Sequence, residues 1–300
     1  MQDKIKMILK HWEMADQTIK QIYDTTWQIG EGYVLKVYQD KEGLERNIKV
    51  LQILEQMKIP VGKIVPVHEN ALYVQYEDDF YFLSEKLQGK NITQIGNDRN
   101  LAEKMGGIIA DLHFAFVKCD ENDSFWHNSL LDEMNGWVKK NFEDSGWELI
   151  SRAEYEKVIE HLAAVYDKLP VQLIHRDVHF GNFLFHNGEL SGYIDFDLSQ
   201  KNIRIFDLCY FMLGLLSEKE KFELTEELWF EFFKNVFQAY QRKVQLTETE
   251  KEAVPYVMEC IELLFISYFA SVKDVACAKS ALGIFEFVKE QEERIRKSII

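Results

Sequence analysis

Two short runs of polar residues carry the residue types that phosphoryl transfer requires. The first run, His175–Asn182, places an aspartate, Asp177, five positions before its final asparagine. The second run follows thirteen positions after that asparagine, where an apolar stretch ends at Asp195. Phosphoryl transfer needs a group that orients the attacking hydroxyl, hard oxygen ligands for Mg²⁺, and positive charge around the phosphates. Asp177 suits the first task, and Asn182 and Asp195 suit the second.

The segment between the two runs predicts how they meet. The pair Asn187–Gly188 stands between two apolar stretches, residues 183–186 and 190–194. An Asn-Gly pair in this setting is a strong hairpin signal, because both turn residues must adopt positive φ. Since a hairpin returns the chain on itself, Asn182 at its start and Asp195 at its end are predicted to lie close together.

The order of these motifs resembles that of a known family. The run Leu173–Asn182, then Asp195–Asp197, then Phe206–Leu208, is similar to the aminoglycoside phosphotransferase and choline kinase family. The order of motifs matches from about Ile19 to Leu216. The resemblance implies an α+β, protein-kinase-like two-lobe fold, Mg²⁺ and ATP as cofactors, and transfer of the γ-phosphoryl group to a hydroxyl of a small molecule.

The resemblance also assigns roles to residues of this sequence. It implies Asp177 as the catalytic base, Asn182 and Asp195 as the Mg²⁺ ligands, and Asp207 as a buried support of the catalytic loop. For Asp197 it leaves three roles open: contact with a second metal ion, binding of the substrate, or support of the loop.

A cation for the nucleotide phosphates is expected on the third strand. The run Val34–Tyr38 alternates in and out, so Lys36 lies on the face opposite its apolar neighbours. The resemblance implies Lys36 as the phosphate-binding lysine. Glu45, in the helix that follows, is the carboxylate expected to hold it, with Glu42 and Glu55 as alternatives.

The segment Leu83–Gly89 resembles the hinge that pairs with the adenine edge through backbone groups, with Glu85 and Leu87 as the expected positions. The first turn of the sheet, residues 23–27, lacks the glycines of a GxGxxG loop. Their absence leaves the choice of nucleotide, ATP or GTP, open. His179 is a further residue that could approach substrate or phosphate.

The elements that position these residues divide into a β-rich part, residues 1–87, and a helical part, residues 88–300. The first contains a helix over residues 41–57 and strands predicted at Ile19–Tyr23, Thr25–Ile29, Tyr33–Tyr38, Ile64–Val67, Ala71–Gln75 and Phe80–Leu83. The second has helices predicted at Asp98–Val117, Leu130–Asn141, Ser151–Leu169, Ile205–Leu216, Lys219–Lys243, Thr249–Ser271 and Val275–Lys297. Capping boxes are predicted at Ser217 with Glu220 and at Thr247 with Glu250.

The length of one segment bears on the acceptor. Only twelve positions separate Asp195 from Asp207, which leaves no room for an activation loop or a peptide-docking platform. A small-molecule acceptor is therefore favoured over a protein: an amino alcohol, a homoserine-like compound, an aminoglycoside or a sugar. Acidic residues such as Glu259 and Glu262, with nearby aromatic residues, would suit an amine. The alternative is that such carboxylates are solvated. A non-catalytic kinase-like binding or coat protein is the alternative function.

The composition bears on nucleic-acid binding, on the state of the cysteines and on membrane insertion. The net charge of −15 argues against nucleic-acid binding, which needs a cationic surface. The four cysteines form no CxxC pair, which is typical of reduced thiols in a cytoplasmic protein. The most apolar stretch, Val254–Val272, is interrupted by Glu259 and Glu262, so it is expected to be a buried helix and not a membrane span.

Overall fold

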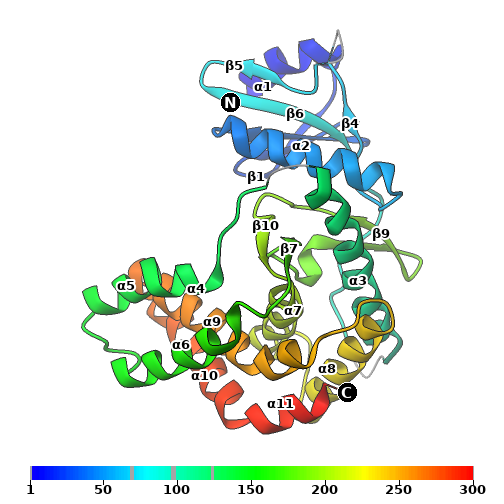
Figure 1. Ribbon diagram of the computed structural model, residues 1–300. Helices are drawn as coiled ribbons and strands as arrows, with labels where there is room; N and C mark the ends of the chain where they lie inside the picture. The colour runs from blue at the N-terminus through cyan, green and yellow to red at the C-terminus, as the bar shows by residue number, and fades with distance from the viewer. Residues whose placement is uncertain (1, 68–70, 96–98, 123–124, 300) are drawn as a thin grey trace. The chain divides into compact units, whose positions relative to one another are not determined.

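The computed structural model describes residues 2–67, 71–95, 99–122 and 125–299. The chain forms two compact units (Figure 1): Met1–Ile92 with Phe180–Asp197, and Thr93–His179 with Leu198–Ile300. The sequence suggested one division near residue 87, with everything after it in the helical part. Segment 180–197 instead belongs to the small unit, because Lys90 and Phe185 exchange backbone hydrogen bonds of 3.0 and 2.9 Å.

The small unit is built on an antiparallel sheet in the order β1-β2-β3-β6-β4, with β5 paired to β6. The strands are β1 (Ile19–Tyr23), β2 (Thr26–Ile29), β3 (Tyr33–Tyr38), β4 (Ile64–Val65), β5 (Val74–Tyr76) and β6 (Asp79–Glu85). All six were predicted, and their ends differ from the prediction by a few residues. In the central pair, Lys36 lies opposite Phe82, which fixes its position in the sheet.

Different helices contact the two faces of this sheet. Helix α1 (Gln2–Leu9) and η1 (Lys10–Trp12) pack their apolar side chains on the face that carries Leu35 and Leu83. Helix α2 (Lys41–Gln56) reaches the opposite face, where its Asn47 donates a 2.6 Å hydrogen bond to the hydroxyl of Tyr38. Because side chains alternate along a strand, Lys36 shares this second face with Tyr38.

The predicted hairpin is confirmed. Strands β8 (Phe183–His186) and β9 (Glu189–Tyr193) pair antiparallel, and the short helix η4 (Phe180–Asn182) precedes them. The two turn residues, Asn187 and Gly188, have φ values of 52° and 79°, as a two-residue hairpin turn requires.

The larger unit is helical, with one two-stranded sheet. Its elements are α3 (Arg99–Asn122), α4 (Leu130–Glu133), η3 (Met134–Val138), α5 (Lys139–Asp144), α6 (Arg152–Tyr166), β7 (Val171–Ile174), β10 (Gln200–Ile203), α7 (Ile205–Ser217), α8 (Glu226–Gln241), α9 (Glu248–Ser271), α10 (Val275–Glu290) and α11 (Glu292–Ser298). The capping box of Thr247 and Glu250 is confirmed. The one predicted at Ser217 is wrong, because Ser217 ends α7 and α8 is capped by Thr225.

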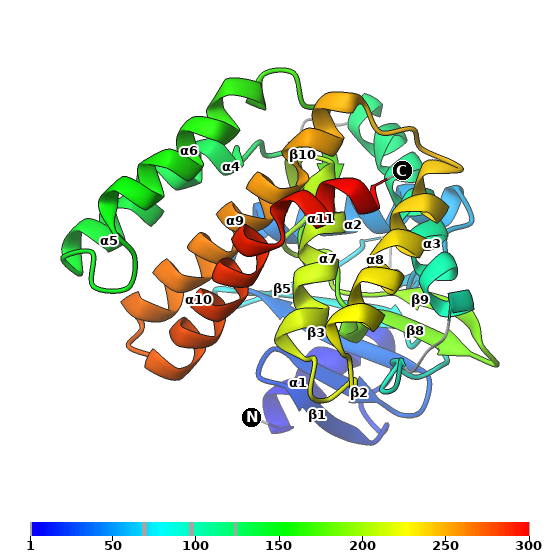
Figure 2. The same ribbon diagram turned by 90° about the horizontal axis from the view of Figure 1, so that it is seen from below.

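Helix α9 lies at the centre of this unit, alongside α10 (Figure 2). Within the described residues it is the one helix long and apolar enough to cross a membrane. However, 67% of its most apolar window is buried inside the protein, which is the behaviour of a core helix. Pro255 lies inside the helix, which begins seven residues earlier at Glu248. All four cysteines are free, and Cys119, Cys209 and Cys260 are buried.

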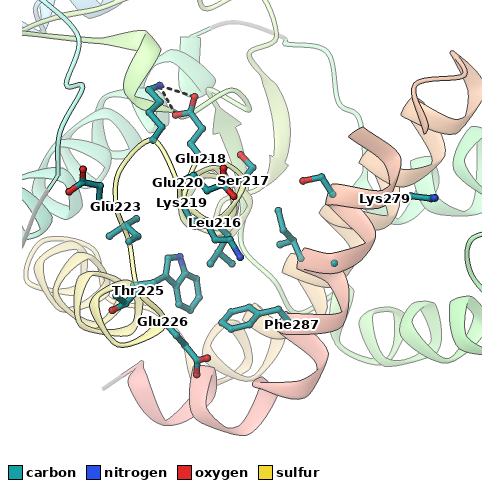
Figure 3. Close-up of a pocket in the computed structure, with 16 residues that line it drawn as sticks. Leu216, Ser217, Glu218, Lys219, Glu220, Glu223, Thr225, Glu226, Lys279 and Phe287 are labelled. Atoms are coloured by element: carbon teal, nitrogen blue, oxygen red, sulfur yellow. Dashed lines mark hydrogen bonds and ion pairs between the residues drawn. The ribbon is translucent and has the colours of Figure 1, made fainter. Parts of the chain in front are cut away.

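A groove of about 1070 Å³ opens in the helical unit between the α7–α8 connection and α10 (Figure 3). Its lining combines glutamates and lysines, including the ion pair of Lys221 with Glu218 at 2.8 Å. None of the catalytic, nucleotide-binding or metal-binding candidates named from the sequence lines this groove. It is therefore separate from the candidate site.

The contact of α3 with α8 provides a stability prediction. A Cβ at Gly106 would lie 2.1 Å from the backbone oxygen of Val236, whereas a Cβ at Gly107 would meet only the end of Lys243, 3.7 Å away. Gly106→Ala should therefore lower the free energy of unfolding by about 1–3 kcal/mol, because backbone atoms must move. Gly107→Ala should be neutral or stabilise by up to about 1 kcal/mol, because alanine is the better helix former. Equal effects in urea denaturation would contradict this account of the α3–α8 contact.

Candidate active site

The hairpin brings the two predicted metal ligands together. The backbone N–H of Ile194 donates a 3.0 Å hydrogen bond to the carbonyl of Asn182, so Asn182 and Asp195 lie side by side where the hairpin begins and ends. Asn182 is buried, and the side chain of Asp195 is half exposed. Asp195 has a φ of 64°, a left-handed conformation that is uncommon for residues other than glycine. The arrangement follows from the hairpin predicted by Asn187–Gly188.

Lys36 lies between two carboxylates. Its Nζ is 2.9 Å from Oδ1 of Asp195 and also contacts Oδ2 of Asp197. Burial alone would lower the pKa of Lys36, but the charges of Asp197 and Asp195 outweigh it and raise this pKa above its usual value. The lysine therefore remains a cation, which is compatible with the predicted phosphate-binding role.

The carboxylate predicted to hold Lys36 lies elsewhere. Glu45 accepts a 3.0 Å hydrogen bond from the hydroxyl of Tyr73 and lies 3.6 Å from Lys41. The prediction that Glu45 holds Lys36 is therefore not met. The physical reason is the orientation of α2, whose buried stripe contains Leu44, Asn47, Ile48, Leu51 and Leu54 and leaves Glu45 exposed.

A chain of hydrogen bonds connects α2 to Lys36 instead. Asn47 donates to the hydroxyl of Tyr38, Tyr38 donates to Oδ1 of Asp197, and Asp197 contacts Lys36. Burial, followed by the charge of Asp197, raises the pKa of Tyr38, so the phenol stays protonated and remains a donor. Sequence reasoning missed both Tyr38 and Asn47. The signal available for Tyr38 was its place two residues after Lys36, on the same face of β3.

In the helical unit, Asp177 is held by two neighbours. The hydroxyl of Tyr210 on α7 donates a 2.8 Å hydrogen bond to its Oδ1, and Nε2 of His179 lies 3.5 Å from its Oδ2. Burial opposes ionisation of Asp177, but His179, Tyr210 and His175 together lower its pKa to about 2. The carboxylate is therefore ionised at neutral pH. Tyr210 could have been found from the sequence, because it lies one helical turn after Asp207.

Asp207 fixes the backbone of the same loop. Its carboxylate accepts hydrogen bonds from the backbone N–H groups of His175 (2.9 Å) and Arg176 (2.8 Å), and it lies 3.0 Å from Nε2 of His113. Asp207 is fully buried. Arg176 has a left-handed φ of 69°, and its guanidinium pairs with both oxygens of Glu133 at 2.7 and 2.9 Å. These contacts explain how the loop keeps an unfavourable backbone conformation.

The hinge residues end strand β6 in the small unit. The backbone N–H of Glu85 donates a 2.7 Å hydrogen bond to the carbonyl of Lys63. The backbone N–H of Lys86 donates one of 2.7 Å to the carbonyl of Gly32. Within the described residues, the backbone N–H of Leu87 has no hydrogen-bond partner. The N–H of Glu85 is therefore already bonded within the unit, and that of Leu87 is not.

The donor set in the small unit fits Mg²⁺. An amide oxygen from Asn182 and a carboxylate from Asp195 are hard ligands, and Mg²⁺ is usually held by one or two protein groups plus phosphate oxygens and water. The ammonium of Lys36 already lies against Asp195 and Asp197, which shows that the two carboxylates converge on a position suited to a cation. Within the part of the chain that the structure describes, no group of three or more histidine, cysteine or acidic side chains is arranged to hold a metal.

Solved structures identify the fold as kinase-like. An amicoumacin kinase in complex with AMP-PNP and Ca²⁺ has a TM-score of 0.70 at 18% identity, covering 98% of this chain and 96% of that one. A microcompartment-associated aminopropanol kinase has a TM-score of 0.71 at 15% identity, covering 98% of each chain. A GDP complex of aminoglycoside 2'-phosphotransferase-IIIa has a TM-score of 0.67 at 14% identity, covering 97% and 98%. At these identities the likeness establishes the fold.

Sequence comparison identifies the family. Residues 17–253 match the phosphotransferase enzyme family, and the protein belongs to it. The resemblance inferred from the motifs is thereby confirmed. Among characterised proteins, a homoserine kinase from Gluconobacter oxydans (strain 621H) is 28% identical over 186 residues, 60% of this chain. The match spans about half of that relative, 55% of its length.

The contact of Tyr210 with Asp177 gives a pH-dependent prediction. The depressed pKa of Asp177 contributes stability at pH values above about 4, which is lost as the pH falls toward 2. Tyr210→Phe removes a donor to the charged carboxylate. It should lower the free energy of unfolding by about 1–2 kcal/mol at pH 7, and the deficit should narrow below about pH 4.

Tyr166→Phe is the matched control, because the hydroxyl of Tyr166 makes its hydrogen bonds with uncharged groups, among them Ser129 and Asn202. Its deficit should not change with pH. Urea denaturation between pH 7 and pH 3 measures both variants. If the deficit of Tyr210→Phe were as independent of pH as that of the control, the hydroxyl of Tyr210 would not be stabilising a charge.

Proposed function

We propose that this protein transfers the γ-phosphoryl group of ATP to a hydroxyl of a small molecule, with Asp177 orienting that hydroxyl and accepting its proton. The observation that carries the proposal is the loop His175–Asn182. Asp207 fixes its backbone, Tyr210 and His179 keep Asp177 ionised, and the loop ends at Asn182. Such a loop supplies orientation and electrostatics, which are what phosphoryl transfer requires.

The nucleotide is proposed to bind through the small unit. Asn182 and Asp195 would hold Mg²⁺, which neutralises charge on the phosphates when bound. Lys36 supplies a further positive charge, and Asp197 with Tyr38 orients it. Leu87 offers its backbone N–H to the base. The amicoumacin kinase was solved with AMP-PNP and the aminoglycoside phosphotransferase with GDP, so GTP is a second candidate donor.

A low-mass acceptor is proposed because the described segment between Asp195 and Asp207 is too short for an activation loop that docks a protein. Between Asp195 and Asp207, residues 200–203 form β10, which pairs with β7. This strand leaves no long loop in the place where an activation segment would be needed. The names of the relatives, which include a homoserine kinase and an aminopropanol kinase, support small hydroxyl acceptors. The alternative, a non-catalytic binding protein, would not need an ionised Asp177 next to Tyr210 and His179.

The first functional prediction concerns nucleotide binding. Mg²⁺ with ATP should raise the Tm of the protein, because a ligand that binds only the folded state stabilises it. Asp195→Ala should abolish most of the Mg²⁺-dependent part of that shift by removing a metal ligand. Asp3→Ala, an exposed aspartate on α1 of the same unit, is the control and should keep the full shift. A wild-type protein without a Mg²⁺-dependent shift for ATP or GTP would exclude the kinase proposal.

The second functional prediction concerns Asp177. Asp177→Asn keeps the size of the side chain but removes its charge, so kcat should fall by about 10²–10⁴-fold with little change in nucleotide affinity. The control is Asp167→Asn, an exposed aspartate of the same unit, which should keep the wild-type kcat. Loss of nucleotide affinity at unchanged kcat would reassign Asp177 to metal binding.

A further inference from the structure

The side chain of Asn91 contacts the backbone on both sides of a predicted metal ligand. Asn91 belongs to the small unit and follows strand β6. Its Nδ2 donates hydrogen bonds to the carbonyl oxygens of Phe180 (3.1 Å), Gly181 (2.7 Å) and Phe183 (3.1 Å). These three residues flank Asn182 in the chain. Asn91 therefore holds the backbone from which the side chain of Asn182 projects.

The chemistry of this contact determines which end of the Asn91 amide faces the turn. A carbonyl oxygen only accepts hydrogen bonds, so three carbonyls require the NH₂ end of the side chain. That group has two hydrogens, so two of the carbonyls share one of them, as is common at helix ends. Residues Phe180–Asn182 form the short helix η4, and the last carbonyls of a helix need donors from outside it. Asn91 thus caps the end of η4.

The hairpin fixes the remaining backbone group of Asn182. The carbonyl of Asn182 accepts the 3.0 Å hydrogen bond from the N–H of Ile194. Asn182 is 5% exposed, so its side chain has little freedom once its backbone is held. The direction of a predicted Mg²⁺ ligand therefore depends on two contacts, one from the hairpin and one from Asn91. A ligand group must be held within a fraction of an ångström to bind well.

The chain that precedes Asn91 is aligned along the hairpin. Lys90 and Phe185 exchange backbone hydrogen bonds of 3.0 and 2.9 Å. Gly89 has a φ of 123°, and a Cβ at this position would lie 2.8 Å from the carbonyl oxygen of Phe185. A residue with a side chain would force the two segments apart. The glycine thus permits the close approach that brings the amide of Asn91 to the turn.

Packing does not explain the position of Asn91. The residue is exposed, so it buries little apolar surface, and its contribution is the set of hydrogen bonds from Nδ2. All three of these bonds go to the turn that carries Asn182. Partners that orient metal ligands without touching the ion are a general feature of metal sites.

We propose that Asn91 is a positioning residue for Mg²⁺, which holds Asn182 in the orientation that binds the ion. The inference rests on the proposed kinase function, in which Mg²⁺ is bound together with the nucleotide. Asn91 acts through Asn182 and is not itself a ligand. Without it, the turn would have to be ordered when the ion binds, and that ordering costs free energy which a preorganised turn avoids.

The experiment measures how much Mg²⁺ strengthens nucleotide binding. Calorimetry gives the Kd of AMP-PNP in EDTA and in excess Mg²⁺, and the ratio of the two values is the magnesium gain. Asn91→Ala removes the three hydrogen bonds, whereas Asn91→Asp keeps the size of the side chain and replaces the donor by an acceptor. Asn182→Ala removes the ligand itself and provides the background for a double-mutant cycle.

Ser191→Ala is the matched control. The hydroxyl of Ser191 donates a hydrogen bond to the carbonyl of Gln88, so this variant loses a bond between the hairpin and the same stretch of chain as Asn91. The bonds from Asn91 to the turn stay in place. The control therefore separates the positioning of Asn182 from a general loosening of the contact between the two segments.

Asn91→Ala and Asn91→Asp should each lower the magnesium gain by about 10-fold, as expected for partners that orient metal ligands, with little change in the Kd measured in EDTA. Ser191→Ala should keep the wild-type gain. In the Asn182→Ala background, Asn91→Ala should lower the gain no further, because a positioning residue acts only through the ligand it holds. The Tm without ligand shows that each variant is folded.

Three results would overturn the inference. They are a wild-type gain in the folded Asn91 variants, an equal loss of gain in Ser191→Ala, and a further loss from Asn91→Ala in the Asn182→Ala background. In each case the wild type shows the magnesium gain, so the kinase proposal stands. A wild-type protein with no magnesium gain for AMP-PNP or GMP-PNP would overturn the kinase proposal and this inference with it.

Discussion

The pairing of Lys36 with Asp195 and Asp197 is the interaction on which the small unit depends. Two carboxylates separated by one residue repel each other unless a cation lies between them. Lys36 comes from the middle of the sheet, and the carboxylates come from the end of the hairpin. Their attraction therefore joins two segments that are far apart in the sequence. The single positive charge of Lys36 offsets one of the two negative charges.

In the helical unit, by contrast, the carboxylate that fixes the candidate catalytic loop is fully buried. Asp207 is not neutralised by a lysine or an arginine. It accepts backbone N–H groups from His175 and Arg176, and His113 lies against it. Such hydrogen bonds stabilise a carboxylate and at the same time fix the backbone that donates them. The left-handed residue Arg176 and the adjacent Asp177 are positioned by this contact, so the geometry of the loop is determined by a residue thirty positions away.

The buried glutamates of the helical unit show how the fold distributes charge. Glu133 is paired with Arg176, and Glu250 is paired with Arg204 and closes the capping box of α9. Glu259 lies within reach of Lys289 and Arg296. Each of these carboxylates has a cation of the protein nearby, as buried charges usually do. Glu262 differs from the other three, because burial alone raises the pKa of its carboxyl to about 8.

Much of the site was determined by the sequence, because its signals are local. The Asn187–Gly188 turn is specified by the φ values that its residues must adopt, so the approach of Asn182 and Asp195 could be predicted without a structure. Strand alternation likewise placed Lys36 on the correct face. Only the tertiary structure decided which partner each charge found. Glu45 was chosen by its distance along the chain, but the rotation of α2 turned Asn47 inward and left Asp197, delivered by the hairpin, to meet Lys36. The burial of Glu262 could not be predicted from the sequence either. It depends on the elements packed around α9 and not on the residues beside Glu262 in the chain.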